Sequence, residues 1–243
     1  MYGETINRRL DLEEQFQRAG MLLTNENIDY LHTKTVAIFG VGGVGGYVVE
    51  GLVRTGIGHF ILIDNDEVNL TNLNRQIIAT HKSIGRKKVE VAKERILDIN
   101  PNATVEIKEM FYLPENADEL DLSKVDYIVD AIDTVVAKCE IAKRAEELNI
   151  PAISSMGTGN KINGENFIVT DIYKTKECPL AKAMRSRLRK MGVKKLKVVY
   201  SEDTALKPIA PEELQRTPGS VAWPPSIAGM LVAGEVIKDL IKK

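Results

Sequence analysis

Short apolar runs alternate with longer amphipathic stretches through the first two thirds of this chain. Buried strands are predicted over residues 35–40, 59–64, 104–108, 126–130 and 152–156, and helices over residues 45–55, 85–99 and 135–148. Strands that alternate with helices typically form parallel sheets, because each helix carries the chain back across the sheet. The pattern therefore predicts an α/β fold, a Rossmann-like and mostly parallel sheet with helices on both faces.

The regular alternation weakens after Met156. Residues 203–226 hold five of the nine prolines and predict a long loop. In this loop Trp223 is expected to anchor the chain, and stacking on a base is the alternative. The stretch 226–241 is apolar but too short to span a bilayer, so we expect it to pack against the sheet and expect no integral membrane segment.

A chain of 243 residues with 44% hydrophobic content can bury one substantial core, which predicts a single domain over residues 1–243. Apolar positions that include Phe16 and Leu22 predict two short helices within residues 12–31. The expected parts are N-terminal helices (1–33), a nucleotide-binding half (34–157) and a substrate-side, C-terminal half (158–243). The first twenty residues are mostly polar and charged, so we expect no signal segment and a cytoplasmic protein.

A glycine-rich run follows the first predicted strand, with glycines that include Gly40, Gly42, Gly43 and Gly45. Glycine lets the backbone approach phosphate oxygens, and a helix that opens near Gly45 points unpaired N–H groups at the anion. Asp64 ends the next predicted strand, where a carboxylate can accept ribose hydroxyl groups. The same fingerprint serves NAD, FAD and ATP, so alone it predicts a nucleotide and no more.

A dense polar cluster follows Asp64 and favours ATP among these nucleotides. Its members are Asp66, Asn72, Asn74, Arg75 and Gln76. A dehydrogenase needs only the acid at the second strand end, whereas this set of carboxylates, amides and a cation suits a triphosphate with a metal ion. The alternative is a solvated loop in which the asparagines cap helices.

The spacing of these motifs resembles the adenylation domain of the ubiquitin-activating enzyme superfamily. The matching segments are Gly40-x-Gly42-Gly43-x-Gly45, Asp64-x-Asp66-x-Val68, Thr71-Asn72-Leu73-Asn74-Arg75-Gln76 and Gly85-x-x-Lys88. The resemblance implies the adenylation fold of that superfamily, with ATP and Mg²⁺ as cofactors. It implies that Arg75 and Lys88 contact the triphosphate and that Asp133 holds the magnesium ion. Asp130 is the alternative metal ligand.

Physical chemistry supports cations at such a site. Attack of a carboxylate on the α-phosphorus of ATP brings negative charges together, so preorganised positive groups must be in place before the reaction begins. Asp133 follows a predicted strand, at the sheet edge where open α/β folds bind ligands.

The net charge of −1 gives no overall attraction to nucleic acid, but one segment is strongly basic. Its candidate phosphate-binding residues are Lys182, Arg185, Arg187, Arg189, Lys190, Lys194 and Lys195. Pro179 suits the first turn of a helix, in which apolar positions such as Ala183, Met184 and Leu188 leave the cations exposed. The segment predicts salt-dependent contact with phosphates, and a solvated helix face is the alternative.

Motifs in the second half resemble the tRNA threonylcarbamoyladenosine dehydratase branch of ThiF-type adenylation domains. They lie at residues 170–175, 179–190, 197–202 and 219–229. The resemblance implies an ATP-dependent cyclisation of threonylcarbamoyladenosine in tRNA, beside the anticodon, through a carboxyl adenylate. The branch more often has an aspartate before the Pro-Leu-Ala sequence, where this chain has Cys178.

The segment Phe16-Gln17-Arg18 is similar to an aromatic-x-Arg motif of the superfamily, although an arginine that usually precedes it is replaced by Gln15. The resemblance implies a homodimer in which Arg18 reaches the triphosphate of the partner subunit and acts as a catalytic cation. An exposed helix residue is the alternative role for Arg18.

Two other activities are weighed against this hypothesis. An activator of a sulfur-carrier or ubiquitin-like protein would use the same chemistry but typically adds zinc-binding cysteine pairs and a thiol nucleophile. This chain has only Cys139, expected to be structural, and Cys178, which precedes Pro179 and has Lys174 and Lys176 nearby. A cysteine desulfurase or sulfur-acceptor partner is left open. A nicotinamide-dependent oxidoreductase or nucleotide sensor would make the polar cluster and Lys88 incidental.

Overall fold

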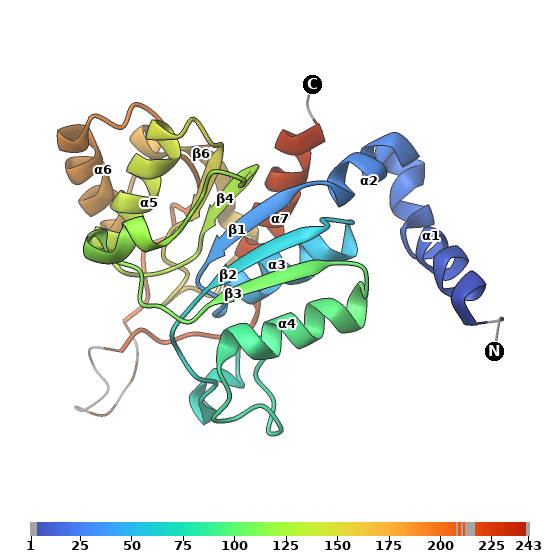
Figure 1. Ribbon diagram of the computed structural model, residues 1–243. Coiled ribbons are helices and arrows are strands. Elements are labelled where there is room, and N and C mark those ends of the chain that lie inside the picture. Colours follow the sequence, from blue (N-terminus) through green and yellow to red (C-terminus); the bar gives the residue numbers. More distant parts are fainter. Residues whose placement is uncertain (1–3, 208, 210, 212–216, 242–243) are drawn as a thin grey trace.

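One twisted sheet runs through the computed structural model, which describes residues 4–207, 209, 211 and 217–241, with side chains from residue 14 onward (Figure 1). The strands of these residues are β1 (Thr35–Phe39), β2 (His59–Ile63), β3 (Thr104–Lys108), β4 (Tyr127–Asp130), β5 (Ala152–Ser155), β6 (Phe167–Asp171) and β7 (Lys197–Ser201). Their order is β3-β2-β1-β4-β5-β7-β6, and every pairing is parallel except that of β6 with β7. The predicted mostly parallel sheet is confirmed.

Helices cover both faces of the sheet (Figure 1). They are α3 (Gly45–Arg54), α4 (Lys88–Ile99) and α7 (Trp223–Ile241) on one face, and α5 (Val135–Glu147) and α6 (Pro179–Met191) on the other. The alternation of side chains along β1 explains this arrangement, because Val36 and Ile38 join the apolar cluster of the first face while Ala37 and Phe39 join a cluster on the second. Short 3₁₀ turns lie at η1 (Leu70–Asn72), η2 (Pro114–Glu119), η3 (Gly164–Asn166) and η4 (Ile172–Lys174).

Two N-terminal helices, α1 (Glu4–Leu23) and α2 (Asn25–His32), extend to one side of the sheet (Figure 1). Phe16 is buried and packs edge-on against the His32 ring, with 5.0 Å between centroids. The prediction of two helices is confirmed, although the first is longer than expected. Of the apolar positions that predicted these helices, Phe16 is buried, whereas 86% of Leu22 is exposed.

The C-terminal third departs from the prediction at two places. Strands β6 and β7 lie in a region that was assigned no strand. Helix α7 begins at Trp223, three residues before the expected end of the loop, because Pro224 and Pro225 occupy its first turn, where no N–H donor is needed. Helix α7 packs against the sheet as expected, on β4, β5, β6 and β7, and it also packs on α3. Within the described residues, no helix is long and apolar enough to cross a membrane.

Asn160 holds both ends of the connection between β7 and α7. Its backbone is left-handed, with φ of 58°, a conformation that asparagine tolerates. Its N–H donates to the Gly219 carbonyl (2.7 Å), its carbonyl accepts from the Leu206 N–H (2.8 Å), and its Oδ1 accepts from the Gly219 N–H (2.6 Å). Trp223 Nε1 donates to the Ile162 carbonyl (2.6 Å), which agrees with the predicted anchoring role.

Candidate active site

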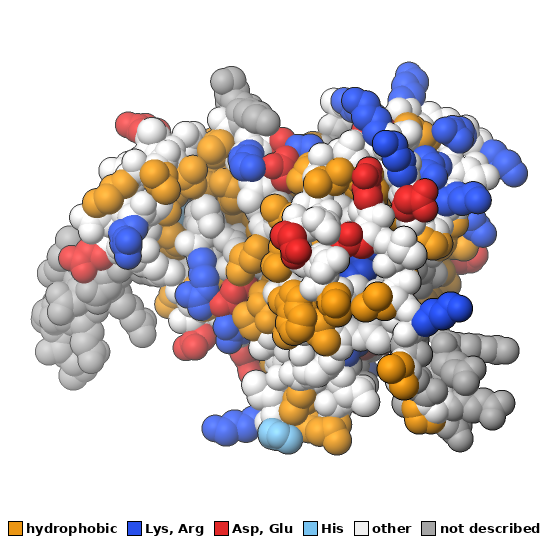
Figure 2. Space-filling view, turned by 180° about the vertical axis from the view of Figure 1, so that it is seen from behind, with side chains coloured by type: hydrophobic (Ala, Val, Ile, Leu, Met, Phe, Trp, Pro, Cys, Tyr) orange, Lys and Arg blue, Asp and Glu red, His pale blue; other side chains and the backbone are white. Residues whose placement is uncertain are grey.

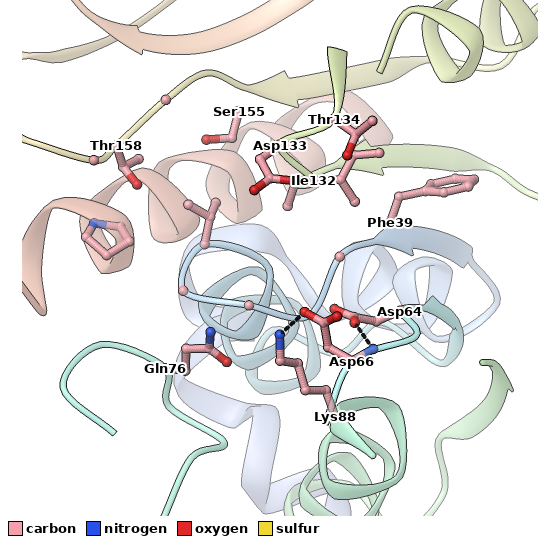
Figure 3. A pocket seen from close by; sticks show the side chains of 18 of the residues that line it. Phe39, Asp64, Asp66, Gln76, Lys88, Ile132, Asp133, Thr134, Ser155 and Thr158 are labelled. Carbon is pink, nitrogen blue, oxygen red and sulfur yellow. Dashed lines mark hydrogen bonds and ion pairs between the residues drawn. The ribbon is translucent and has the colours of Figure 1, made fainter. Parts of the chain in front are cut away.

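A cavity of about 600 Å³ lies at the carboxyl ends of β1, β2, β4 and β5. Open parallel sheets bind ligands at this edge. Figure 3 shows Asp133, Ser155 and Thr158 on one wall and Asp66, Gln76 and Lys88 on the other. The glycine run, the polar cluster and Asp133, which are far apart in the sequence, therefore line the same cavity.

The glycine run turns so tightly that side chains are excluded at two positions. Gly40 has φ of +86°, and a Cβ on it would lie 2.9 Å from the Ala131 carbonyl oxygen. A Cβ on Gly45 would lie 1.8 Å from the Gly40 carbonyl oxygen. Asp64 ties the turn to the end of β2, because its Oδ2 accepts from the Val41 N–H (2.7 Å). The backbone at the start of α3 is thereby held open toward the cavity.

Lys88 is the first residue of α4, and only 6% of it is exposed. Its Nζ contacts Asp66 Oδ2 at 2.6 Å, and Asp66 in turn donates its N–H to Asp64 Oδ1 (2.8 Å) (Figure 3). The Asp66 side chain is 58% exposed. A buried ammonium group with a largely solvated partner is well placed to exchange that partner for a phosphate oxygen.

The polar cluster divides into ligand-facing and structural members. Arg75 lines the cavity and uses Nη1 to donate to the Thr71 carbonyl (2.9 Å) and to Asn74 Oδ1 (3.0 Å), which orients its guanidinium group. Gln76 is buried, and its Oε1 accepts no hydrogen bond within the described part of the chain. Asn72 also lines the cavity, but its Oδ1 accepts from the Asn69 N–H (3.0 Å), a capping contact of the kind that the alternative interpretation proposed.

The two candidate metal ligands lie in different environments. Asp130 is 2% exposed and pairs with the Lys138 ammonium (2.9 Å), so its charge is already compensated. Asp133 is exposed to the cavity and has no ion pair among the described residues. Those residues contain no group of three acids, histidines or cysteines that would hold a metal by itself. Magnesium is usually held by one or two carboxylates together with substrate phosphates, and Asp133 fits that role.

The basic segment forms α6 and the loop after it. Ala181, Met184 and Leu188 are its buried face, whereas Ala183 is exposed, contrary to the prediction. Of the seven cations proposed above, six are exposed and Arg185 is half-buried. Figure 2 shows Lys and Arg side chains gathered over this part of the surface, at the upper right.

Two of the seven cations of α6 and its following loop make side-chain contacts within the protein. Arg185 donates to the Thr175 hydroxyl, and the Arg189 guanidinium lies over the Tyr173 ring, 5.3 Å from its centroid. The other five, Lys182, Arg187, Lys190, Lys194 and Lys195, have no ion pair within the described chain, so their charges point to solvent.

Both cysteines are buried in the apolar cluster beneath α6. Burial raises the pKa of the Cys139 thiol to about 11, which agrees with its expected structural role. Cys178 is 8% exposed and precedes the first turn of α6, so it is buried rather than displayed on a polar turn.

Arg18 does not line the cavity of its own chain. It is exposed on α1, on the helix pair that extends from one side of the sheet (Figure 1).

Some cavity residues were not identified from the sequence. Phe111 and Tyr112 follow β3, and Pro218 and Ser220 close the cavity from the connection before α7. Asn74 Nδ2 donates to the Ser220 carbonyl (2.8 Å), which joins the polar cluster to that connection. The only sequence signal for Phe111 is its place just after a strand end. Ser220 lies in the 219–229 motif, but nothing in the sequence indicates that it reaches Asn74, which is 146 residues away.

A glycine turn, buried and oriented cations and a free carboxylate at the carboxyl edge of a parallel sheet define a nucleotide site of the adenylating type. The chain belongs to the ThiF family, whose sequence pattern matches residues 16–243.

Several characterised proteins are similar to it. The chain is 38% identical over 241 residues to tRNA threonylcarbamoyladenosine dehydratase of Bacillus subtilis, covering 94% of this chain and 95% of that protein. The tRNA N6-threonylcarbamoyladenosine dehydratase of Escherichia coli, solved in complex with ATP, superposes with a TM-score of 0.87 and 29% identity over 94% of both chains. Ubiquitin-like modifier-activating enzyme 5 of Caenorhabditis elegans is 32% identical over 158 residues, 61% of this chain and 37% of that protein. These comparisons confirm the predicted adenylation fold and family resemblance.

Proposed function

We propose that this chain is an ATP-dependent tRNA threonylcarbamoyladenosine dehydratase that works through a carboxyl adenylate. The observation that carries the proposal is the similarity of nearly the whole chain to dehydratases of that name, and a cavity lined by the glycine turn, Arg75 and Lys88 supports it. We further propose that residues 1–243 act as one domain and that the protein works in the cytoplasm.

The reaction has two steps that balance without a protein nucleophile. A carboxylate oxygen of the threonylcarbamoyl group bonds to the α-phosphorus of ATP, and the bond from that phosphorus to the bridging oxygen breaks to release pyrophosphate. A carbamoyl nitrogen or oxygen of the same modified base then attacks the activated carbonyl carbon and displaces AMP, with loss of one proton. The net change in the base is the loss of one water. The second nucleophile is already attached, so its effective concentration is high.

The residues of the cavity are proposed to act on the phosphates. Lys88 and Arg75 bind the triphosphate and stabilise the charge that develops as pyrophosphate leaves. The backbone around Gly40, Gly42, Gly43 and Gly45 approaches the phosphates, with Asn72 and Gln76 beside it. Asp64 accepts the ribose hydroxyls, and Asp66 orients Lys88. Asp133 is the proposed ligand of a Mg²⁺ ion, which would supply further positive charge to the phosphates.

The cations of α6 and its following loop are proposed to bind the tRNA backbone. Their support is the concentration of exposed charge on a protein whose net charge is only −1.

A homodimer in which Arg18 serves the partner's site is proposed because Arg18 is exposed and lies outside the cavity of its own chain. Leu22 and Met21, 86% and 76% exposed on the same helix, supply apolar surface for such contact. A sulfur-transfer partner stays a prediction.

Mass spectrometry of tRNA nucleosides tests the proposal. Purified protein, ATP, Mg²⁺ and threonylcarbamoylated tRNA should yield a base lighter by one water, and Lys88→Ala should abolish this change. ATP–pyrophosphate exchange should depend on the modified tRNA. Exchange that depends instead on the C-terminus of a carrier protein, or a base of unchanged mass, would reject the assignment in favour of the carrier-activating alternative.

A further inference from the structure

A lysine lies fully buried behind the cavity wall that contains Asp133 and Ser155. Lys138, in the first turns of α5, has a side chain with 0% exposure, and it contacts Asp130, whose side chain is 3% exposed. Burying a charged pair costs desolvation energy, and apolar side chains of similar volume often stabilise a core equally well. The pair therefore calls for an explanation beyond stability.

All three donors of the Lys138 ammonium group are used. Its Nζ contacts Asp130 Oδ2 (2.9 Å), the Ile132 carbonyl oxygen (3.1 Å) and the Ser155 carbonyl oxygen (2.9 Å). Asp130 completes the network, because its Oδ2 accepts from Ser154 Oγ (2.5 Å) and its Oδ1 accepts from the Ile132 N–H (3.3 Å). An apolar side chain cannot replace contacts to two converging carbonyls.

The two carbonyl groups belong to neighbouring strand ends that both line the cavity. Ile132 immediately precedes Asp133 in the turn from β4 to α5, and Ser155 ends β5. Figure 3 shows Ile132, Asp133 and Ser155 together on one wall. One buried ammonium group thus fixes the spacing between the turn that carries Asp133 and the edge that leads to Thr158.

We propose that Lys138 is a positioning residue that holds the Asp133 turn and the end of β5 in the geometry required for adenylate formation. This inference rests on the proposed function, in which Asp133 is the metal ligand. Lys138 touches neither the substrate nor the metal, and it acts through the two backbone segments.

The test removes both charges together, because Lys138→Met alone leaves Asp130 buried and unpaired and is expected to unfold the protein. In the double variant Asp130→Asn, Lys138→Met, the amide oxygen still accepts from Ser154 and the methionine fills the lysine's volume. Lys143→Met is the matched control. It makes the same substitution on the same helix, at a side chain that is 37% exposed and does not line the cavity.

Hydrogen–deuterium exchange gives a readout that does not depend on activity. In the double variant, amides of residues 131–134 and 155–158 should exchange at least tenfold faster, while those of residues 41–46 keep their rates. Uniform acceleration over the chain would assign the pair a purely structural role and overturn the proposal. Unchanged rates in the two segments would overturn it as well.

ATP–pyrophosphate exchange gives the second readout. The double variant should lose about tenfold in kcat and need a higher Mg²⁺ concentration for half-maximal rate, with KM for ATP within twofold of the wild type. Wild-type kcat and Mg²⁺ dependence would overturn the proposal. If the wild-type protein itself fails to act on modified tRNA, the proposed function fails, and the hydrogen-exchange experiment still decides whether Lys138 holds the two segments.

Discussion

Gly45→Ala should damage the nucleotide site out of proportion to its size. The added Cβ would lie 1.8 Å from the Gly40 carbonyl oxygen, and ordinary Cβ contacts begin near 3.4 Å, so that carbonyl must retreat by roughly 1.5 Å. The Gly40 backbone has little room to move, because a Cβ built on it would lie 2.9 Å from the Ala131 carbonyl oxygen. We expect a loss of stability of about 1–3 kcal/mol, typical of overpacking, which lowers Tm by roughly 5 °C in a chain of this length.

The rate of adenylate formation should be affected more than the free energy of unfolding, because a displacement of this order at a reacting centre costs about 100-fold in rate. ATP affinity by calorimetry, ATP–pyrophosphate exchange and thermal unfolding measure the three effects. Gly234→Ala is the control: it lies inside α7, nothing is within 4 Å of its added Cβ, and it should stabilise the protein by about 0.5–1 kcal/mol. Wild-type ATP affinity and Tm in Gly45→Ala would refute the reasoning.

Four further outcomes are expected. Lys88→Met should remove about 3 kcal/mol of transition-state stabilisation for adenylation, which is roughly 100-fold in exchange rate. Tm should change little, because the Asp66 partner is mostly solvated. Near-normal exchange would contradict the role of Lys88. Replacing Lys182 and Lys190 by glutamine should reduce the salt slope of tRNA binding by about one unit per lost contact, without affecting ATP affinity; an unchanged slope would indicate a solvated helix face. Mixing Arg18→Ala and Lys88→Met subunits should restore part of the activity through heterodimers with one intact site, and no restoration despite subunit exchange would exclude the trans role. At pH 8, well below its raised pKa of about 11, Cys139 should be almost entirely thiol, so native protein should resist alkylation there by peptide mapping, and rapid labelling would contradict its burial.

The nucleotide-binding half could be predicted from the sequence because β1, β2, β4 and β5 are buried on both faces, and because helices alternate with the strands. The predicted strand over 104–108 has the observed bounds, and the helix predicted over 45–55 ends one residue earlier, at Arg54. The C-terminal third was less predictable. β6 is a short antiparallel strand at the sheet edge, and no repeated strand–helix unit marks it. The prolines of α7 resemble loop residues, although the first turn of a helix accepts them.

The candidate site shows the same division. Its place at a strand end indicated Asp64, and the resemblance to the adenylation domain indicated Arg75 and Lys88. All three line one cavity. Sequence reasoning left Asp130 and Asp133 as alternatives, because their difference is set by a contact eight residues along the chain from Asp130. Lys138 looks like one of several cations on α5 until the fold turns it inward. The spacing of apolar residues identifies the buried face of an amphipathic helix, but it does not show which lysine on that helix pairs with a buried acid.

Asn160 bonds to both ends of the connection between β7 and α7, so the length of that connection has little influence on the shape of the cavity. Asn160 bonds to the backbone of both Leu206 and Gly219. Pro218 and Ser220, which line the cavity on either side of Gly219, are therefore held in place by this anchor. Doubling the number of residues in a closed loop costs only about 0.6 kcal/mol. A change in the number of residues between Leu206 and Pro218 should therefore cost little stability and leave Pro218 and Ser220 in place at the cavity.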